Sequence, residues 1–253
     1  MSDPARDFAG RVALVTGGSR GIGAGTALAL ASRGAKVVVT GRDEAALASV
    51  VQSIRRAGGE AAAFAADLTQ AAPSEALRVA ARTAFGPPQL LVACAGGGGA
   101  LTPLVDESLD NWRATLDRNL TTAFLTLRAF LPAMYERGQG SVVLMSSSAG
   151  RHISGASAPY TAAKAGLQAL MRQAASEAGP RGVRINAIAP SAIVTERLAA
   201  QPPSVREQIA KGFPLGRLGE VEDVVAATLF LLSDAAGWIT GVTLDVAGGR
   251  VMV

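Results

Sequence analysis

The sequence predicts an α/β fold in which one parallel sheet of about seven strands carries helices on both faces. Short runs rich in β-branched residues alternate with longer Ala- and Leu-rich segments along the chain. This alternation is typical of parallel sheets covered on both sides, in three layers. No Pro- or Ser-rich linker and no internal repeat divides the 253 residues. We therefore expect one doubly wound domain over residues 1–253.

The strands are expected where short apolar runs lie near Gly or Pro, at 11–16, 35–40, 60–67, 88–96, 140–147, 182–190 and 241–246. Segments of helical periodicity between them predict helices at 23–34, 43–59, 72–85, 106–136, 158–178 and 220–233. The Pro-containing stretch 196–219 is irregular, and we expect it to form a mobile lid over the substrate. Ligands of such sheets bind beyond the carboxyl ends of the strands, so the chemistry should follow residues 16, 40, 67, 95, 147 and 190.

Composition limits the classes of function. Hydrophobic residues make up 49% of the chain and charged residues 17%, which supports a large core. The net charge of +4 is spread out and aromatic residues are only 4%, so nucleic-acid binding is not indicated. A single cysteine suits a reducing compartment, and no signal core or membrane-length apolar run is present. We expect a cytoplasmic protein without a metal, membrane or nucleic-acid partner.

A glycine-rich turn follows the first predicted strand. The segment VTGGSRGIG places Gly17, Gly21 and Gly23 between that strand and a helix. Glycine permits positive φ and close approach of the backbone to a ligand, and a helix N-terminus offers free N–H groups to a pyrophosphate. The spacing G-x-x-x-G-x-G differs from the G-x-G-x-x-G of other dinucleotide folds. A plain turn is the alternative, but the position after the first strand favours phosphate binding.

The end of the second strand favours NADP(H) over NAD(H). Folds that prefer NAD carry an acid there to bind the ribose 2′-OH, whereas an arginine accommodates a 2′-phosphate. This chain has Gly41 and Arg42, and Arg20 in the glycine turn can reach the same position. Two guanidinium groups can hold a phosphate through charge-assisted hydrogen bonds. The alternative is that both arginines are solvated, with Asp43 pairing to Arg42.

The segment GASAPYTAAKAG sets a tyrosine and a lysine four residues apart among small side chains. The chain has two tyrosines and only three lysines among its 24 basic residues. Residues i and i+4 share one helix face, so Tyr160 and Lys164 are expected side by side. A catalytic pair is one interpretation of Y-x-x-x-K, and an exposed surface pair is the other.

Together these segments resemble the short-chain dehydrogenase/reductase superfamily. The resemblance spans residues 8 to 250 and is carried by TGGSRGIG at 16–23, DRNLTTAF around Asn119, MSSSAG at 145–150, YTAAK at 160–164, RINAIAPSAIVT at 184–195 and ITGVTLDVAGG at 239–249. The chain is most similar to 3-oxoacyl-[acyl-carrier-protein] reductases and related NADPH-dependent carbonyl reductases. This implies a Rossmann-type fold and reversible hydride transfer between NADPH and a carbonyl or secondary alcohol. A 3-oxoacyl thioester is one implied substrate, and a small ketone or alcohol is the alternative.

The resemblance implies that Tyr160 protonates the carbonyl oxygen during reduction. A free tyrosine has a pKa of about 10, and a nearby ammonium lowers it. Lys164, one helical turn further, would supply that charge and bond the nicotinamide ribose. The alternative class of function is a dinucleotide-binding sensor without catalysis, but such sensors typically lose the Tyr or the Lys.

The resemblance also implies roles for a serine and an asparagine. Ser147, at the end of the fifth strand, would donate to the carbonyl oxygen and stabilise developing charge. Ser146 and Ser148 are its rivals. Asn119 would hold a water linked to Lys164, whereas its alternative is a mid-helix Asn that bonds the backbone.

Further cofactor contacts and partners carry over by position. The full set implied is Gly17, Ser19, Arg20, Gly21, Ile22, Gly23, Arg42, Asp67, Leu68, Ala95, Gly96, Tyr160, Lys164, Pro190, Ile193 and Thr195. Asp67 and Leu68 would meet the adenine. A homotetramer or homodimer is expected. An acyl carrier protein or a CoA thioester is an implied partner, with Arg137 and Arg181 as docking residues or as plain surface.

Two features depart from the family or stay open. The chain reads Ala-Cys-Ala-Gly at 93–96, where Asn-Asn-Ala-Gly is usual, so two strand-linking amides are missing and a local stability cost is expected. Cys94 is expected to be a small buried side chain rather than a reactive thiol. His152, the only histidine, either contacts the substrate or is a plain loop residue, which we favour.

Overall fold

The structure of the chain is a computed structural model that describes residues 7–99 and 101–252. Seven parallel strands form one sheet in the order β3-β2-β1-β4-β5-β6-β7. The strands are β1 Val12–Thr16, β2 Lys36–Gly41, β3 Glu60–Ala65, β4 Leu90–Ala93, β5 Gly140–Met145, β6 Val183–Pro190 and β7 Thr243–Val246. The strand order reverses between β1 and β4, and the predicted α/β fold is confirmed.

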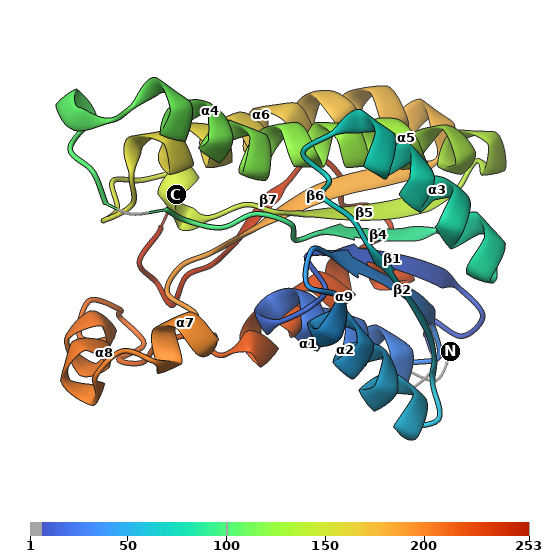
Figure 1. Ribbon diagram of the computed structural model, residues 1–253, viewed down its shortest axis with the longest axis horizontal. Helices are drawn as coiled ribbons and strands as arrows, with labels where there is room; N and C mark the ends of the chain where they lie inside the picture. Colours follow the sequence, from blue (N-terminus) through green and yellow to red (C-terminus); the bar gives the residue numbers. More distant parts are fainter. Residues whose placement is uncertain (1–6, 100, 253) are drawn as a thin grey trace.

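The helices form two layers around this sheet (Figure 1). They are α1 Gly21–Ser32, α2 Glu44–Arg56, α3 Ala71–Phe85, α4 Leu109–Leu116, α5 Thr122–Arg137, α6 Ala158–Ala178, α7 Glu196–Ala199, α8 Pro203–Ala210 and α9 Val221–Leu232. α1, α2 and α9 cover one face, while α3, α5 and α6 cover the other and α4 packs against α6. No helix in the described ranges combines the length and apolarity needed to cross a membrane.

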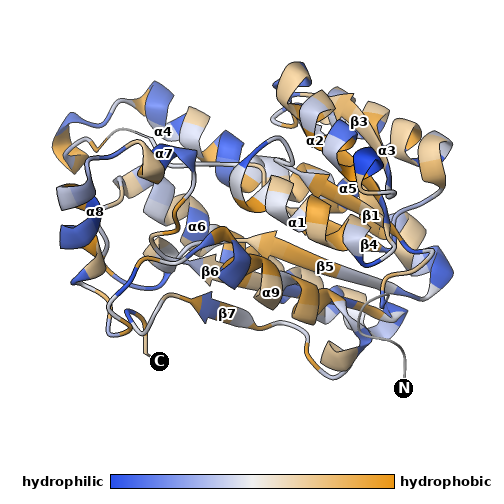
Figure 2. Cartoon of the chain, turned by 90° about the horizontal axis from the view of Figure 1, so that it is seen from below, coloured by the Kyte–Doolittle hydropathy of each residue, from blue (hydrophilic) through white to orange (hydrophobic). Residues whose placement is uncertain are grey.

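The central strands form the apolar middle of the molecule. Every residue of β1, β4 and β5 is buried, and these strands are the most uniformly hydrophobic part of Figure 2. Side chains alternate between the two faces of a strand. Ala13 and Val15 therefore join the core under α1 and α9, whereas Leu14 joins the core under α5 and α6.

Three predicted elements differ in the structure. The predicted strand 88–96 is shorter, because the ladder of β4 ends at Ala93 before the glycine run. The predicted helix 106–136 is divided into α4, a wider π-helical turn at Asp117–Thr121, and α5. Ser108 begins α4 by accepting a hydrogen bond from the Asn111 N–H at 3.1 Å. The stretch 196–219, predicted to be irregular, contains the two short helices α7 and α8, which project beyond the carboxyl ends of the strands (Figure 1).

Candidate active site

α6 presents three polar side chains on one face toward the end of β5. Tyr160, Lys164 and Gln168 follow each other at intervals of four residues; Lys164 and Gln168 are buried and Tyr160 is half-buried. The Lys164 ammonium donates to the Met145 carbonyl at 2.8 Å. The alternative of an exposed Tyr–Lys surface pair is therefore wrong. Gln168 was not predicted, although its i+8 spacing from Tyr160 was a usable signal.

The three serines after β5 have different environments. Ser146 is buried, donates to the Lys164 carbonyl at 3.1 Å and accepts from the Gln168 amide at 2.9 Å. Its hydroxyl therefore joins β5 to α6. Ser148 is also buried. Only Ser147 is half-buried, and a hydrogen bond with its side chain lowers the pKa of Tyr160, so these two side chains lie together beyond the end of β5.

The pKa of Tyr160 does not follow the sequence expectation. Burial raises it above its ordinary value, and the hydrogen bond from Ser147 and the charge of Arg197 lower it by less. Lys164 lies 5.6 Å from the centroid of the Tyr160 ring and bonds a carbonyl instead of the phenol. The prediction that Lys164 lowers this pKa is therefore wrong for this structure. The phenol stays protonated at neutral pH, which is the form that can give a proton to a carbonyl oxygen.

Lys164 and Cys94 lie close enough for the charge of each to affect the pKa of the other. Burial lowers the pKa of Lys164 to about 8. Burial also raises the pKa of Cys94 to about 12, against the opposing charge of Lys164. A thiol with such a pKa is not a nucleophile at neutral pH, which agrees with the expectation that Cys94 is a small, unreactive side chain.

Asn119 bonds the backbone, which is the alternative that the sequence left open. It lies in the π-helical turn and is buried. Its amide nitrogen donates to the carbonyls of Gly97 and Thr115 at 3.1 and 3.0 Å, and its oxygen accepts from the Gly97 N–H at 2.9 Å. Both amide hydrogens are thus used. The Asn119 side chain holds the glycine segment after β4 in place, and its link to a water stays a prediction.

The glycine turn is packed so closely that side chains are excluded. Gly17 has φ +64°, and a Cβ there would lie 2.8 Å from the backbone of Cys94 and Ala95. A Cβ on Gly23 would lie 2.2 Å from the Gly17 carbonyl oxygen. Arg20, the residue before α1, makes no side-chain cap, so the first-turn N–H groups remain available to an anion.

The two arginines expected at the ribose differ in their partners. Arg20 forms an ion pair with Asp43 at 2.6 Å, and the other Asp43 oxygen caps α2 by accepting from the Ala46 N–H at 3.0 Å. Asp43 therefore pairs with Arg20, not with Arg42 as the sequence alternative had it. Arg42 is exposed. The pKa of Asp67 is lowered, first by two hydrogen bonds from Thr69 and then, to a smaller extent, by the charge of Arg42, while burial acts in the opposite direction.

The remaining predicted cofactor residues lie around the same edge. The Thr195 side chain would be 3.2 Å from a Cβ on Gly21, so the loop after β6 lies over the glycine turn. The Thr16 hydroxyl accepts a hydrogen bond from the Ala95 N–H at 3.2 Å and so links β1 to the end of β4. The two asparagine amides that are usual at positions 93 and 94 are replaced here by Ala93 and Cys94. The side chains of Leu68 and Ile193 are buried, and that of Ile22 is partly buried. Ser19 lies beside Gly41, Pro190 ends β6, and Gly96 is exposed.

His152 belongs to a polar group beside β7. Arg151 forms an ion pair with Asp245 at 3.2 Å, and His152 lies near the same carboxyl group. The ring Nδ1 is 2.5 Å from the Ile153 carbonyl oxygen. These contacts tie the segment between Ser147 and Tyr160 to the last strand. No group of three or more metal-ligating residues gathers anywhere in residues 7–99 and 101–252.

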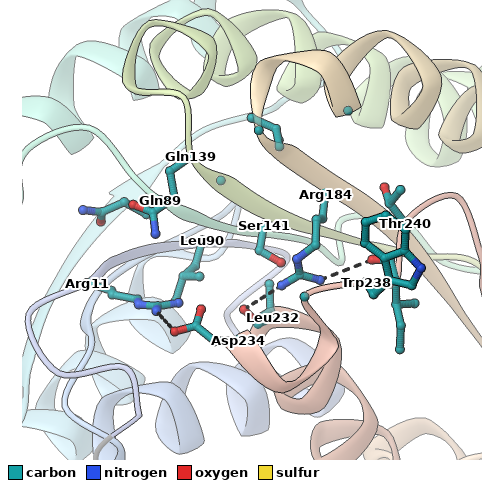
Figure 3. A pocket seen from close by; sticks show the side chains of 16 residues that line it. Arg11, Gln89, Leu90, Gln139, Ser141, Arg184, Leu232, Asp234, Trp238 and Thr240 are labelled. Atoms are coloured by element: carbon teal, nitrogen blue, oxygen red, sulfur yellow. Dashed lines mark hydrogen bonds and ion pairs between the residues drawn. The ribbon is translucent and has the colours of Figure 1, made fainter. Parts of the chain in front are cut away.

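A cavity of about 550 Å³ lies at the opposite, amino-terminal edge of the sheet (Figure 3). Several of its polar side chains already have partners within the chain. Arg11 pairs with Asp234 at 2.5 Å. Arg184 donates to the carbonyls of Leu231, in the last turn of α9, and Ser233, just after it, at 2.8 and 2.9 Å. Trp238 stands fully exposed at its rim. The arginines therefore stabilise the end of α9, and the cavity is separate from the candidate active site.

Comparisons with known proteins agree with this geometry. The family described as Enoyl-(Acyl carrier protein) reductase matches residues 17–250. The 2,5-dichloro-2,5-cyclohexadiene-1,4-diol dehydrogenase of Sphingobium indicum is 38% identical, over 97% of this chain and 98% of that protein. The 3-oxoacyl-[acyl-carrier-protein] reductase of Escherichia coli is 35% identical, over 98% of this chain and 100% of that protein.

A solved structure extends the similarity to three dimensions. The crystal structure of a 3-oxoacyl-[acyl-carrier-protein] reductase with bound NAD from Brucella melitensis superposes with a TM-score of 0.90 at 32% identity, covering 100% of this chain and 97% of that one. The similarity thus extends over the sheet, the glycine turn and the segment 196–219. The chain belongs to the short-chain dehydrogenase/reductase family and is an oxidoreductase of the nicotinamide-dinucleotide type.

Proposed function

We propose that the chain transfers hydride reversibly between NADP(H) and a carbonyl or secondary alcohol, with Asn119, Ser147, Tyr160 and Lys164 as its catalytic residues. The observation that carries the proposal is the pair of hydroxyls of Tyr160 and Ser147 at the carboxyl end of β5, with the buried Lys164 beside them. This is the edge of a parallel sheet at which ligands bind. A sensor would not need these two hydroxyls side by side.

In the proposed mechanism the substrate carbonyl oxygen lies between the two hydroxyls. Ser147 donates a hydrogen bond that stabilises the negative charge developing on this oxygen. Tyr160 gives its proton to the same oxygen during reduction and takes it back during oxidation. Lys164, whose ammonium lies 5.6 Å from the centre of the Tyr160 ring, would donate a hydrogen bond to the ribose of a bound coenzyme. Asn119 keeps the Gly97 backbone fixed at the site wall.

The turn after β1 fits a dinucleotide. The glycines leave no Cβ in the way, and the uncapped N-terminus of α1 suits a pyrophosphate. Gly17, Gly21, Ala95 and Thr195 would hold it, and Asp67 with Arg42 would flank the adenosine. When bound, the coenzyme supplies the hydride that the protein itself lacks.

The substrate class is tested directly by assay. The two curated relatives act on a cyclic diol and on an acyl-carrier thioester, so both classes are candidates for this chain. NADPH consumption should be measured with acetoacetyl-CoA and with cyclohexanone and its substituted derivatives. We expect turnover with at least one of them. A purified, folded chain that binds NADPH but reduces neither class would favour the sensor alternative.

The preference for NADP(H) rests on Arg42 and Arg20. Arg42→Ala should weaken NADPH binding by about tenfold, because one charge-assisted bond to the 2′-phosphate is lost. Binding of NADH, which lacks that phosphate, should change less than about twofold. Arg56→Ala, at the far end of α2, is the matched control. Equal losses for both coenzymes, measured by fluorescence titration, would contradict the assignment of Arg42 to the phosphate.

Arg20 is expected to exchange partners when the coenzyme binds. Its pair with Asp43 is largely exposed on both sides, and such pairs contribute about 0–1 kcal/mol. A 2′-phosphate can therefore compete with the carboxylate. Arg20→Ala should weaken NADPH binding less than Arg42→Ala does.

We also propose that copies of the chain associate through α9 and β7. Large apolar side chains stand exposed on α9, on β7 and in the segment between them, namely Phe230, Trp238, Val242 and Leu244. Exposed apolar patches of this kind mark interaction surfaces. Sedimentation equilibrium should give a dimer or tetramer of the 25.6 kDa chain, and a monomer at micromolar concentration would refute the proposal.

A further inference from the structure

Arg197 lies in the lid and reaches across the mouth of the candidate active site. It is the second residue of α7, whose start is held by hydrogen bonds from the Leu198 and Ala199 N–H groups to the Thr195 carbonyl at 2.9 and 2.8 Å. Thr195 in turn lies against Gly21 of the glycine turn. The backbone of α7 is therefore anchored on the cofactor side of the site.

The Arg197 side chain extends toward the opposite wall. Its guanidinium donates to the Gly98 carbonyl at 3.4 Å, in the segment after β4 that Asn119 holds at Gly97. This bond is long and uses one of the five N–H donors of an arginine. The guanidinium thus lies between the lid and the β4 loop with most of its donors available.

No carboxylate in the described part of the chain neutralises Arg197. None of the ion pairs found there includes it, although Arg20 and Arg217 each pair with an aspartate. The neighbouring Glu196 carboxylate lies beside Gly21 instead. A cation held at the mouth of a site without a protein counter-ion is suited to an anionic ligand.

The charge of Arg197 also acts at the reacting group. Its charge lowers the pKa of Tyr160, against the larger effect of burial. Lys164, from the same helix as Tyr160, is directed to the Met145 carbonyl. A substrate whose oxygen meets Tyr160 therefore lies within electrostatic range of the Arg197 guanidinium.

We propose that Arg197 binds an anionic group, a carboxylate or a phosphate, that the substrate carries away from its reacting carbonyl. This inference rests on the proposed carbonyl reduction at Tyr160. A planar guanidinium binds either oxyanion with two parallel hydrogen bonds. Binding would replace the long Gly98 contact and draw α7 over the substrate.

The test compares a charged substrate with its neutral twin. Wild type, Arg197→Met and Arg197→Lys are assayed with 4-oxocyclohexanecarboxylate and with its methyl ester. Wild type should prefer the keto acid in kcat/KM by about 10- to 100-fold, as one charge-assisted pair implies. Arg197→Met should abolish this preference by slowing only the keto acid, and Arg197→Lys should restore part of it. Lys211→Met removes another exposed lid charge and should leave the preference intact.

A second pair of probes distinguishes the source of the anion. Acetoacetyl-CoA carries phosphates, whereas acetoacetyl-N-acetylcysteamine has the same thioester without them. A loss in Arg197→Met confined to acetoacetyl-CoA assigns the contact to a phosphate, and a loss confined to the keto acid assigns it to a carboxylate. If Arg197→Met lowers kcat/KM equally for the charged and the neutral member of each pair, Arg197 only supports the lid, and the proposal is overturned.

Two readouts keep the test independent of lid folding and of turnover. With the neutral ester, Arg197→Met should shift upward the pH above which reduction falls as Tyr160 loses its proton, because the charge of Arg197 lowers that pKa. Arg197→Gln replaces the Met variant if the latter does not fold. Calorimetric binding of cyclohexanecarboxylate to the NADP-saturated protein compares the variants without chemistry. Equal binding by wild type and Arg197→Met excludes a carboxylate at this position, and overturns the proposal where acetoacetyl-CoA also shows no selective loss. Failure of the proposed function is distinct, since it shows as absent turnover with every ketone, charged or neutral.

Discussion

Tyr160→Phe is expected to lower kcat for ketone reduction by about 10²–10⁴-fold, the range in which a positioned proton donor contributes. The substitution removes only the hydroxyl and leaves the ring that Lys164 faces at 5.6 Å. NADPH binding should therefore change little, because the glycine turn that would hold the coenzyme is untouched. Stopped-flow measurement of NADPH consumption in a single turnover separates the chemical step from binding and product release.

The chain offers a matched control for this substitution. Tyr135 is its only other tyrosine, lies on α5, and has a pKa that is likewise raised by burial. Tyr135→Phe should keep kcat within about twofold of wild type, as expected for a residue outside the site. If Tyr160→Phe retained more than about a tenth of the wild-type rate, Ser147 or a water would have to be the proton donor, because general acid catalysis is worth more than that.

The fold followed from local pattern because the strands are short, apolar and separated by glycines. The runs at 11–16 and 35–40 became β1 and β2 with bounds nearly unchanged. The π-helical turn at Asn119 could not be read in this way, because the segment 106–136 has a helical pattern on both sides of it. A turn of this kind depends on tertiary bonds, here those of Asn119 to Gly97.

The candidate site was predictable in its residues and less so in its contacts. The spacing of Tyr160 and Lys164 placed them on one face, since i and i+4 positions always share it. The direction of the Tyr160 pKa was missed because burial is a property of the packed fold. The Arg20–Asp43 pair was missed for a similar reason, as it joins two loops 23 positions apart. Arg197 has no sequence signal, since only the folding of the segment 196–219 brings it near Tyr160.

Gly23→Ala is expected to destabilise the protein and to weaken NADPH binding, although alanine is the better helix former. Gly23 is the third residue of α1, so helix propensity alone predicts a gain of about 1 kcal/mol. The added Cβ would, however, lie 2.2 Å from the Gly17 carbonyl oxygen, which is backbone and cannot rotate away. Overpacking of this kind costs about 1–3 kcal/mol. The steric cost should exceed the gain, because relief requires the β1–α1 turn itself to open.

Gly25→Ala on the same helix separates these two effects. A Cβ at Gly25 would lie 2.6 Å from a methyl group of Val221, a side chain at the start of α9 that can shift. This variant should therefore unfold in urea within about 1 kcal/mol of wild type and bind NADPH normally. Gly23→Ala should unfold at lower urea concentration and bind NADPH at least about tenfold more weakly, since an opened turn misplaces the N–H groups of α1. If Gly23→Ala matched wild type in both measurements, the turn after β1 would be more tolerant than its packing implies. The glycine turn would then lose its place as the phosphate site, because a turn that accepts a Cβ at that point does not need the close backbone approach on which the assignment rests.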